Sequence, residues 1–512
     1  MLTKQIQTKQ DLVKYLFEKG ILIEQSVLEK VNEGNISKVA QFIENKKGNF
    51  IIKSEDIEQA ISTNINDTEQ PKKSAQDNQI EKNESRDNDK IRQGSRVKIL
   101  YSYEDVYKKK DMQDFVSIFN KRFEALSKIL KNRIDISSPV SINKLLNKQS
   151  REEVVLIGMI NDMRETKNGH IMLELEDKTG KINVLVNKNR EELLQLAKEL
   201  VLDIVIAVNG TSGDKIVFAN NIYIPDVPLN RELRKSPDEA YMIVISDLHI
   251  GNKDFMHEEF NKLIKWLKGE MGSQKQRSIA KKVKYIIIPG DVVDGVGIHP
   301  GQDKELEIMD IYDQYTKCAE LLSQIPENIE IIISPGNHDA MRIADPQPML
   351  SKEYAKPLWD LPNVTMVTSP GIVNIHGSKN FPGFDILIYH GFSVFYYLDN
   401  VEKIREEGGI KNPDKILKYL LRMRHLAPTH TSTLYIPDHR YDPLVIENVP
   451  DFFITGHTHR AGASNYRNVT LITGSCWNGI SEYALKFGSL PEPAKVPIIN
   501  LQTRNVKMMK FA

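Results

Sequence analysis

Apolar residues recur with different spacings along the chain, and each spacing predicts a different kind of structure. Over residues 1–62 they return every three or four positions, as in amphipathic helices. Over residues 63–96 apolar residues are scarce and both signs of charge are mixed. A segment of that composition cannot bury enough apolar surface to offset the loss of chain entropy. We therefore expect a small helical module followed by a disordered linker.

Residues 97–230 are predicted to form a helix followed by a small β-barrel. The helix covers about 114–131, and a first strand begins at Val154. Further strands are expected at 171–176, 182–186, 204–210 and 216–223, with a helix at 190–200 between the third and fourth strands. This order resembles an OB-fold barrel, and the alternative is another small barrel without a nucleic-acid role.

Aromatic residues are rare in the predicted barrel. Phe218 and Tyr223 are the only Phe, Tyr or Trp residues from 151 to 226. Proteins that bind single strands usually stack the bases on aromatic rings. We therefore expect the barrel to be a structural or protein-docking module more than a strong reader of DNA.

From residue 231 to 512 strands alternate with helices, which is typical of a layered α/β domain. Helices are expected at 258–268 and 304–324, and the last strands at 469–473, 498–501 and 506–510. The predicted fold is thus multi-domain: a helical module (1–62), a linker (63–96), a helix with an OB-like barrel (97–230) and an α/β domain (231–512).

Composition sets few further limits. The chain has 69 basic and 69 acidic residues, so any nucleic-acid surface has to be a local patch. Two cysteines among 512 residues form no disulfide framework, which fits a reducing compartment. The first residues lack the apolar stretch of a secretory signal, and no run of about 18 apolar residues predicts a membrane span. We expect a cytoplasmic protein.

Five short fragments rich in His, Asp and Asn follow apolar runs of the last region. They are Ser246-Asp247-Leu248-His249, Gly290-Asp291-Val292-Val293-Asp294, Gly336-Asn337-His338-Asp339, Tyr389-His390-Gly391 and Gly456-His457-Thr458-His459. An apolar run with such an ending is typical of a buried strand whose carboxyl-terminal loop carries chemistry. Together the fragments indicate a two-metal site that cleaves phosphoesters.

The spacing and residue types of the fragments suit a pair of ions. Asp247 and His249 are two residues apart, as are His457 and His459, and in extended backbone such residues point the same way. Ions roughly 3.5–4 Å apart need a bridging anion, for which Asp291 is the obvious candidate. A mixed nitrogen and oxygen shell favours Mn²⁺, Fe²⁺ or Zn²⁺ over Ca²⁺. We expect Mn²⁺, with iron or zinc as alternatives.

The five fragments, in this order, resemble those of the calcineurin-like metallophosphoesterase superfamily. The resemblance implies two ions that share one carboxylate. The first ion takes Asp247, His249, Asp291 and His459, and the second takes Asp291, Asn337, His390 and His457. It also implies that His338 is not a ligand and instead donates a proton or stabilises charge on the phosphate. Asp339 would then orient His338 or another ligand.

The larger organisation is similar to the small subunit of archaeal family-D DNA polymerase. The phrases SDLHIG, GDVVDG, SPGNHDAMR and ITGHTHRAG fit that family, and the resemblance covers the chain from about residue 97. It implies a metal-dependent 3′–5′ exonuclease that removes misincorporated nucleotides from the primer 3′ end, bound to a large catalytic polymerase subunit. The alternatives are a stand-alone repair nuclease or phosphatase, and a non-catalytic scaffold subunit. A chain that begins near Lys98 is expected to keep binding the large subunit.

Overall fold

The computed structural model describes residues 22–23, 51–52, 96–105, 108–148, 151–479 and 491–512. The chain divides into two compact units, Met1–Arg86 and Asp87–Ala512. In the first unit, β1 (Leu22–Ile23) pairs in parallel with β2 (Ile51–Ile52). The helices predicted within 1–62 and nearly all of the predicted linker lie outside the described residues. Among the described residues, no helix is both long and apolar enough to cross a membrane.

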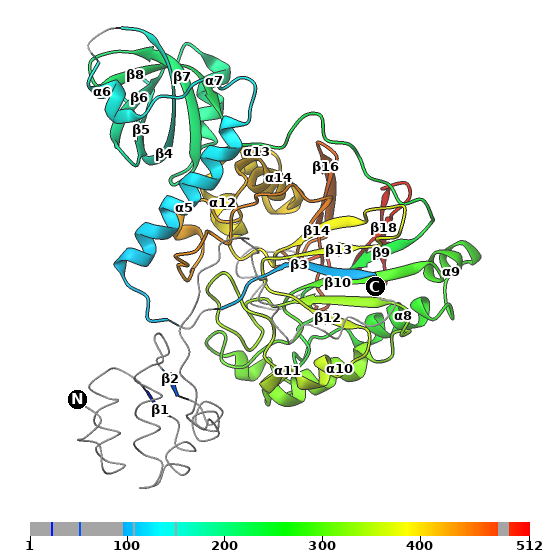
Figure 1. The fold of residues 1–512 in the computed structure, drawn as a ribbon. Coiled ribbons are helices and arrows are strands. Elements are labelled where there is room, and N and C mark those ends of the chain that lie inside the picture. Colours follow the sequence, from blue (N-terminus) through cyan, green and yellow to red (C-terminus); the bar gives the residue numbers. More distant parts are fainter. Residues whose placement is uncertain (1–21, 24–50, 53–95, 106–107, 149–150, 480–490) are drawn as a thin grey trace, which may run out of the picture. The chain divides into compact units, whose positions relative to one another are not determined.

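A closed barrel occupies the early part of the second unit (Figure 1). Its strands run in the order β4-β5-β6-β8-β7 around the barrel. They are β4 (Glu153–Glu165), β5 (Ile171–Asp177), β6 (Gly180–Val186), β7 (Val205–Ser212) and β8 (Ile216–Tyr223). Helix α7 (Glu191–Lys198) lies between the third and fourth strands, and α6 (Ile142–Leu146) packs against β6. The predicted OB-like barrel is confirmed.

Helix α5 (Met112–Lys131) precedes the barrel, where the apolar periodicity predicted a helix. It begins with a capping box, in which the Asp111 side chain accepts from the backbone of Asp114 and the Asp114 side chain accepts from the backbone of Asp111. Its residues Leu126 and Leu130 are buried against barrel residues of β4 and β7. The helix is therefore part of the body that carries the barrel.

Two six-stranded sheets form the centre of the remaining domain (Figure 1). The first has the order β12-β11-β10-β9-β18-β19 and the second the order β16-β17-β15-β14-β13-β3. The strands of the first sheet are β9 (Tyr241–Val244), β10 (Val283–Pro289), β11 (Glu330–Ser334), β12 (Val364–Met366), β18 (Lys495–Asn500) and β19 (Val506–Lys510). Those of the second are β3 (Val97–Ser102), β13 (Gly371–Ile375), β14 (Phe384–Ile388), β15 (Phe452–Thr455), β16 (Gly462–Tyr466) and β17 (Val469–Thr473).

Apolar faces hold the sheets and helices together in layers. One core fills the space between the two sheets, with residues such as Ile287 and Ile386 from opposite sides. The outer face of the first sheet is covered by α8 (His257–Leu267), α9 (Gln274–Ala280), α10 (Ile311–Leu322) and α11 (Lys352–Trp359). That of the second is covered by α12 (Val394–Asn400), α13 (Glu402–Glu406) and α14 (Asp414–Met423). The predicted layered α/β domain is confirmed.

Short 3-10 turns complete the described secondary structure: η1 (Gln302–Lys304), η2 (Gly409–Lys411) and η3 (His430–Ser432). The helix expected to start at residue 304 begins only at Ile311, so that predicted boundary is wrong. Asp310 caps the helix by accepting from the backbone of Tyr312 and Asp313. The residues before it bond elsewhere, since the N–H of Glu307 donates to the Gly251 carbonyl. A tertiary contact therefore overrides the local helical pattern.

Strand β3 departs from the predicted domain limits. It lies in the range 97–230 but pairs antiparallel with β13, as the edge of the second sheet. Val97 is buried there in the core between the sheets. The boundaries of the predicted domains otherwise stay a prediction.

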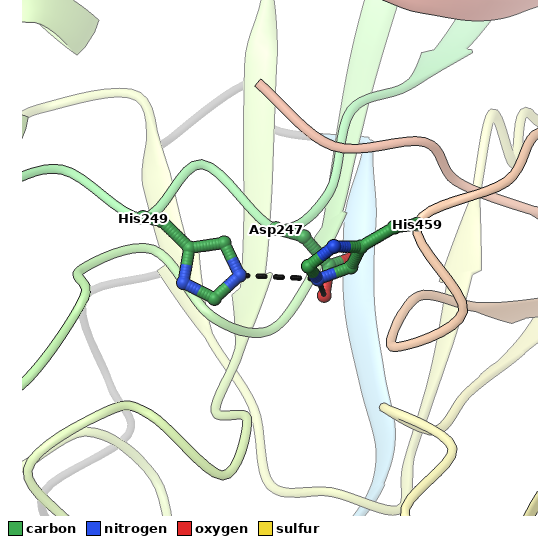
Figure 2. A group of neighbouring side chains, drawn as sticks. All are labelled: Asp247, His249 and His459. Atoms are coloured by element: carbon green, nitrogen blue, oxygen red, sulfur yellow. Dashed lines mark hydrogen bonds and ion pairs between the residues drawn. The ribbon is translucent and has the colours of Figure 1, made fainter. Parts of the chain in front are cut away.

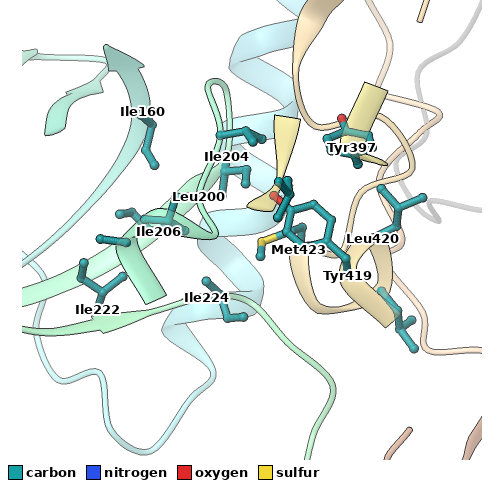
Figure 3. Close-up of a cluster of buried hydrophobic side chains, with 14 of the residues drawn as sticks. Ile160, Leu200, Ile204, Ile206, Ile222, Ile224, Tyr397, Tyr419, Leu420 and Met423 are labelled. Atoms are coloured by element: carbon teal, nitrogen blue, oxygen red, sulfur yellow. The ribbon is translucent and has the colours of Figure 1, made fainter. Parts of the chain in front are cut away.

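The barrel and the second sheet share one apolar core (Figure 3). Barrel residues such as Leu200 and Ile204 belong to the same buried cluster as Tyr419 and Met423 of α14. Polar contacts join the same surfaces, because the Tyr419 hydroxyl donates to the Glu199 carbonyl over 2.9 Å. The barrel is thus packed on the layered α/β domain by burial of apolar surface.

Candidate metal centre

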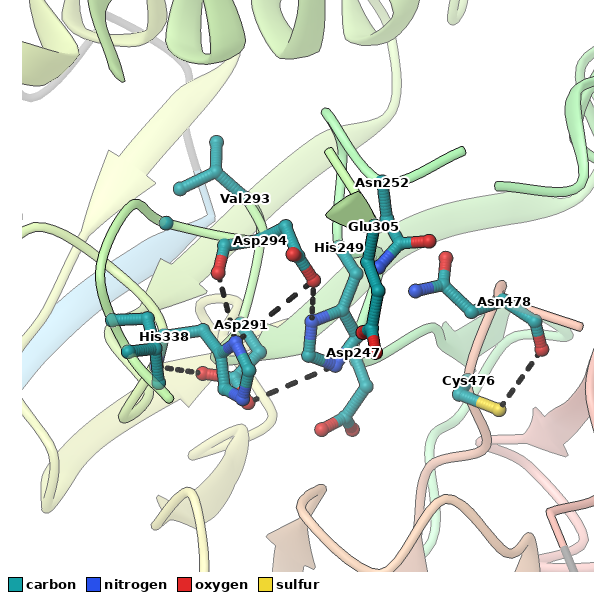
Figure 4. Close-up of polar contacts among 12 residues, drawn as sticks. Asp247, His249, Asn252, Asp291, Val293, Asp294, Glu305, His338, Cys476 and Asn478 are labelled. Carbon is teal, nitrogen blue, oxygen red and sulfur yellow. Dashed lines mark hydrogen bonds and ion pairs between the residues drawn. The ribbon is translucent and has the colours of Figure 1, made fainter. Parts of the chain in front are cut away.

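The predicted ligands lie where strands of both sheets end. The loops that carry them follow β9, β10 and β11 of the first sheet, and β14 and β15 of the second. Strands β9, β10 and β11 run parallel in the first sheet, and β14 and β15 run parallel in the second. The carboxyl ends of the strands in each set therefore lie at the same edge of their sheet. The five fragments, spread over more than 200 residues of sequence, thereby converge, and Figure 4 shows residues of the first three of them.

Asp247, His249 and His459 form the first group of candidate ligands (Figure 2). The Nε2 atoms of the two histidines are 3.2 Å apart, and His459 Nε2 is 3.5 Å from Asp247 Oδ1. The Nδ1–H of His249 donates to Asp294 Oδ1 over 3.1 Å, which leaves its Nε2 lone pair facing His459. Two facing imidazole nitrogens need a cation or proton between them, so this arrangement fits a metal ion.

Asp291, His390 and His457 form the second group. His390 Nε2 lies 3.3 Å from Asp291 Oδ2 and 2.9 Å from Asn337 Oδ1. The Nδ1–H of His390 donates to the Pro289 carbonyl over 2.8 Å, which turns Nε2 toward the other ligands. Asp291 Oδ2 is also 3.9 Å from His249 Nε2 in the first group. Asp291 is thus the carboxylate that lies between the groups.

Negative charge is buried in this centre. The side chains of Asp247 and Asp291 are at most 1% exposed, and in the described part of the chain their ion-pair partners are histidines. Burial opposes protonation of His390, but the Asp291 and Asp247 carboxylates raise its pKa to about 9. Burial and the charge of His390 lower the pKa of His457 to about 3. Protons therefore neutralise only part of this centre, and a metal ion would displace them.

Several ligand residues have left-handed backbone. The φ angles are 50° at Asp247, 49° at His249, 51° at Asp291, 66° at His457 and 54° at His459. Such conformations cost non-glycine residues on the order of 1–3 kcal/mol each and concentrate at functional sites. The expectation of extended backbone is therefore wrong, and His457 and His459 belong to different groups. The strained loops, and not strand alternation, direct these side chains inward.

Close approach explains two of the glycines in the fragments. A Cβ atom at Gly336 would lie 2.2 Å from Asp291 Oδ1, and one at Gly456 would lie 2.0 Å from Ser246 Oγ. Both distances are well below any real contact of a Cβ atom. Glycine at these positions lets the loops approach the carboxylate ligands closely enough to form the centre.

His338 lies beside the first group without an ion pair to Asp339. Its Nδ1–H donates to the Asp294 carbonyl over 2.8 Å, and its ring meets the His249 ring edge-on with centroids 4.5 Å apart. Its backbone N–H donates to Asp291 Oδ1 over 2.8 Å. His338 also lies close enough to His249 and Asp291 to complete a third possible ligand group. Its role as a non-ligand stays a prediction.

Asp339 organises the backbone around Asp291. Its carboxylate accepts hydrogen bonds from the N–H groups of Asp291 at 3.0 Å and Gly336 at 2.8 Å. It also accepts from Val292 and Val293. Burial, together with the charge of Asp291, raises the pKa of Asp339 to about 7. Of the two predicted roles, orienting another ligand fits these contacts, since in the described part of the chain the Asp339 carboxylate hydrogen-bonds to backbone N–H groups and not to the His338 ring.

Asp294, which Figure 4 shows beside His249 and His338, and Gln302 behind it both support the candidate ligands. Asp294 is the last residue of the second fragment, and it contacts both His249 and His338. The Gln302 amide donates to Asp294 Oδ2 and to its carbonyl, each over 2.9 Å. The second Asp of the fragment was a signal for Asp294. Gln302 lies in a short 3-10 turn, and no motif in the sequence pointed to it.

Two family models match the chain. The model of the calcineurin-like phosphoesterase matches residues 241–461, and that of the OB-fold nucleic acid binding domain matches residues 154–214. These ranges coincide with the layered domain and the closed barrel. Both parts of the predicted fold are therefore supported by the sequence comparison as well as by the structure.

Curated relatives extend the similarity over most of the chain. The DNA polymerase II small subunit of Pyrococcus abyssi is 40% identical over 404 residues, which is 78% of this chain and 63% of the relative. That of Pyrococcus furiosus is 38% identical over 78% of this chain and 64% of the relative. That of Methanothermobacter thermautotrophicus is 37% identical over 79% of this chain and 81% of the relative. The chain thus spans less than two thirds of the Pyrococcus relatives that it matches.

Proposed function

The chain belongs to the family of the DNA polymerase II small subunits, and from this premise we propose that its metal centre is a proofreading 3′–5′ exonuclease. The observation that supports the proposal most is the convergence of a full set of ligands around Asp247 and Asp291, two buried carboxylates. A subunit that acted only as a scaffold would have no need of strained loops and unbalanced buried charge. The proposed partner is the large catalytic subunit of a two-subunit replicative DNA polymerase.

Two divalent ions fit the donor atoms, with Mn²⁺ first and iron or zinc as alternatives. The first would be held by Asp247, His249, Asp291 and His459, and the second by Asp291, Asn337, His390 and His457. When bound, such a pair stabilises the charge that develops on a phosphodiester under attack by water. Asp294 and the Pro289 carbonyl fix the tautomers of His249 and His390, so that Nε2 of each ring is available to a metal.

His338 is the proposed proton donor. Its Nδ1–H is committed to the Asp294 carbonyl, which aims the other ring nitrogen away from that contact. Water attacks the phosphorus of the last phosphodiester and releases a proton to solvent, the bond from phosphorus to the 3′ oxygen breaks, and His338 in its imidazolium form gives the proton on Nε2 to that leaving oxygen. The products are a nucleoside 5′-monophosphate and a primer shortened by one nucleotide. General acid catalysis of this kind contributes about 10²–10⁴-fold to a rate.

The barrel offers limited means of holding DNA by itself. The Phe218 ring is 38% exposed and lies 5.8 Å from the guanidinium of Arg151. On the adjoining strands, Glu174 and Glu176 both lie within 4.0 Å of Lys181, which they neutralise. These contacts support a protein-docking role for the barrel more than a strand-binding one, although its family is described as nucleic acid binding.

A nuclease assay on the two-subunit enzyme tests the proposed activity. Primers with a matched or a mismatched 3′ end would be incubated with chelator-treated protein, with and without added Mn²⁺. The expected result is Mn²⁺-dependent release of 5′-mononucleotides from the 3′ end, faster for the mismatch. Cleavage of p-nitrophenyl phosphate without cleavage of DNA would favour a phosphatase. Full activity without the large subunit would favour a stand-alone nuclease.

The partner is tested by truncation. The truncated chain should begin at residue 96. The Arg96 carbonyl accepts a hydrogen bond from the backbone N–H of His376, and Val97 is buried between the sheets. A start near Lys98, as the sequence suggested, would damage the second sheet. A chain lacking residues 1–95 is expected to co-purify with the large subunit. Loss of the complex would place the docking surface before residue 96.

A further inference from the structure

Phe395 places a partly exposed aromatic ring beside the metal centre. It is the second residue of α12, which follows the loop of the ligand His390. The Phe395 ring meets the ring of the ligand His457 edge-on, with centroids 5.1 Å apart and planes at 70°. The Phe392 ring lies 5.7 Å from the same histidine. One ligand of the second group is thus bordered by two phenylalanine rings.

The exposure of Phe395 is not required by the packing of its helix. Val394 and Tyr397 form the buried face of α12 and are fully buried. Phe395 lies off that face and is 39% exposed. The ring thus borders a centre whose candidate ligands are carboxylates, imidazoles and an amide. That combination suits a substrate with a charged group and a flat apolar group close together.

We propose that Phe395 is a substrate-positioning residue on which the base of the terminal nucleotide stacks while its phosphodiester lies at the metal centre. The inference rests on the proposed nuclease function and names the part of the substrate that this ring takes. Every nucleobase has a flat π face, and stacking on an aromatic side chain tolerates any base. A nucleotide consists of such a base joined to a phosphate, which matches the ring and the ligands next to it.

Stacking on Phe395 would also select unpaired ends. A base inside a duplex is stacked on its neighbours, and removing it from the stack costs a few kcal/mol, least for a mismatched base. A terminal base therefore reaches Phe395 more readily when it is unpaired. The alternative is a purely structural role, in which Phe395 only packs against His457 and keeps that ligand in place. The two roles differ in whether the effect of the ring depends on the presence of a base.

The test uses the two-subunit enzyme, Mn²⁺ and single-stranded oligonucleotides that end in a normal nucleotide or in an abasic residue. Phe395→Ala and Phe395→Leu are expected to lower kcat/KM roughly 5- to 100-fold on the normal end, mainly through KM. Phe395→Trp should keep nearly full activity, because it retains an aromatic face. All forms should cut the abasic end equally. Phe218→Leu is the matched control, since it removes a ring of 38% exposure from the barrel.

Four results would overturn parts of this picture in distinguishable ways. Equal losses on the normal and abasic ends would mean that Phe395 acts only through His457. Full activity of Phe395→Leu on the normal end would mean that no aromatic face is used. Elemental analysis of each variant gives the bound Mn²⁺, and a loss of ions in Phe395→Leu also assigns the ring to metal binding alone. Wild-type enzyme that cuts neither end would instead refute the nuclease function itself.

Discussion

Among the residues that the structure describes, two clusters of buried Asp and His side chains differ in what neutralises their charge. At the junction between α5 and the layered domain, Arg122 Nε lies 2.7 Å and His425 Nε2 3.0 Å from Asp442 Oδ2. All three side chains are at most 1% exposed. In the metal centre, by contrast, the buried carboxylates of Asp247 and Asp291 face histidines and one amide.

The difference separates a structural cluster from a functional one. At the junction, Arg122 supplies a permanent charge that outweighs the effect of burial and holds the pKa of Asp442 well below its usual value. Burial, and then the charge of Arg122, lowers the pKa of His425 to about 4, so that this ring stays neutral. In the metal centre, the pKa of His390 is instead raised to about 9 by its carboxylate neighbours. A buried charge has to be paired or bind a metal, and only the junction is complete without one.

Asp291→Asn should have the largest effect on activity. Loss of the carboxylate between the two ligand groups removes several kcal/mol of transition-state stabilisation, or at least about 10³-fold in rate. The free energy of unfolding of the metal-free protein should also fall at neutral pH, because burial is outweighed by His390 and its neighbours, which hold the pKa of Asp291 well below its usual value in the folded chain. The assay of DNA hydrolysis is compared with that of Asp303→Asn, an exposed carboxylate nearby. Wild-type activity in Asp291→Asn would refute its bridging role.

His338→Ala separates chemistry from metal binding. We expect both ions to remain and the rate to fall by about 10²–10⁴-fold, as for loss of a general acid. Elemental analysis and single-turnover kinetics measure the two quantities on the same sample. If the metal content fell with the rate, His338 would be a ligand and the assignment would be wrong.

Asp442→Asn should affect stability and leave the chemistry alone. It leaves Arg122 buried and unpaired, which costs about 3–5 kcal/mol of the free energy of unfolding. Denaturant unfolding of the variant measures this loss, and its kcat at a temperature where it stays folded should match that of wild type. A change in kcat without a change in stability would mean that the junction is coupled to the centre and not merely structural.

Asp294→Ala tests the support of the first ligand group. It removes the acceptor that fixes the His249 tautomer, and loss of such a partner typically costs 10- to 100-fold in metal affinity or activity. Titration with Mn²⁺ gives the affinity, and Gln302→Ala should weaken it in the same direction by less. Unchanged affinity in Asp294→Ala would return this residue to a simple turn role.

A further expected effect concerns the pH dependence of the stability of the junction. The pKa of His425 is lowered from 6.5 to about 4 in the folded chain. Between these values the unfolded chain binds the extra proton, so the free energy of unfolding decreases as the pH falls through this window. The decrease is at most about 1.4 kcal/mol per pKa unit. His425→Gln should flatten this slope, whereas His439→Gln, at an exposed position, should not. Equal slopes in all three proteins would contradict the assignment.

The sequence predicted most of the fold because its signals were local. Alternation located the barrel strands, and polar fragments after apolar runs located the candidate ligands. The pairing of Arg122 with Asp442 spans 320 positions and has no local signal. The pairing of β3 with β13 and the hydrogen bond from Gln302 to Asp294 likewise have no local signal in the sequence. The left-handed loops were missed because they are imposed by the ligand arrangement against the local preference of each residue.

The most direct test of the metal centre is anomalous diffraction from crystals grown with Mn²⁺. Two peaks are expected, roughly 3.5–4 Å apart. One should contact Asp247, His249 and His459, the other Asn337, His390 and His457, with Asp291 touching both. A single peak, or two peaks without Asp291 between them, would contradict a dinuclear centre in this chain.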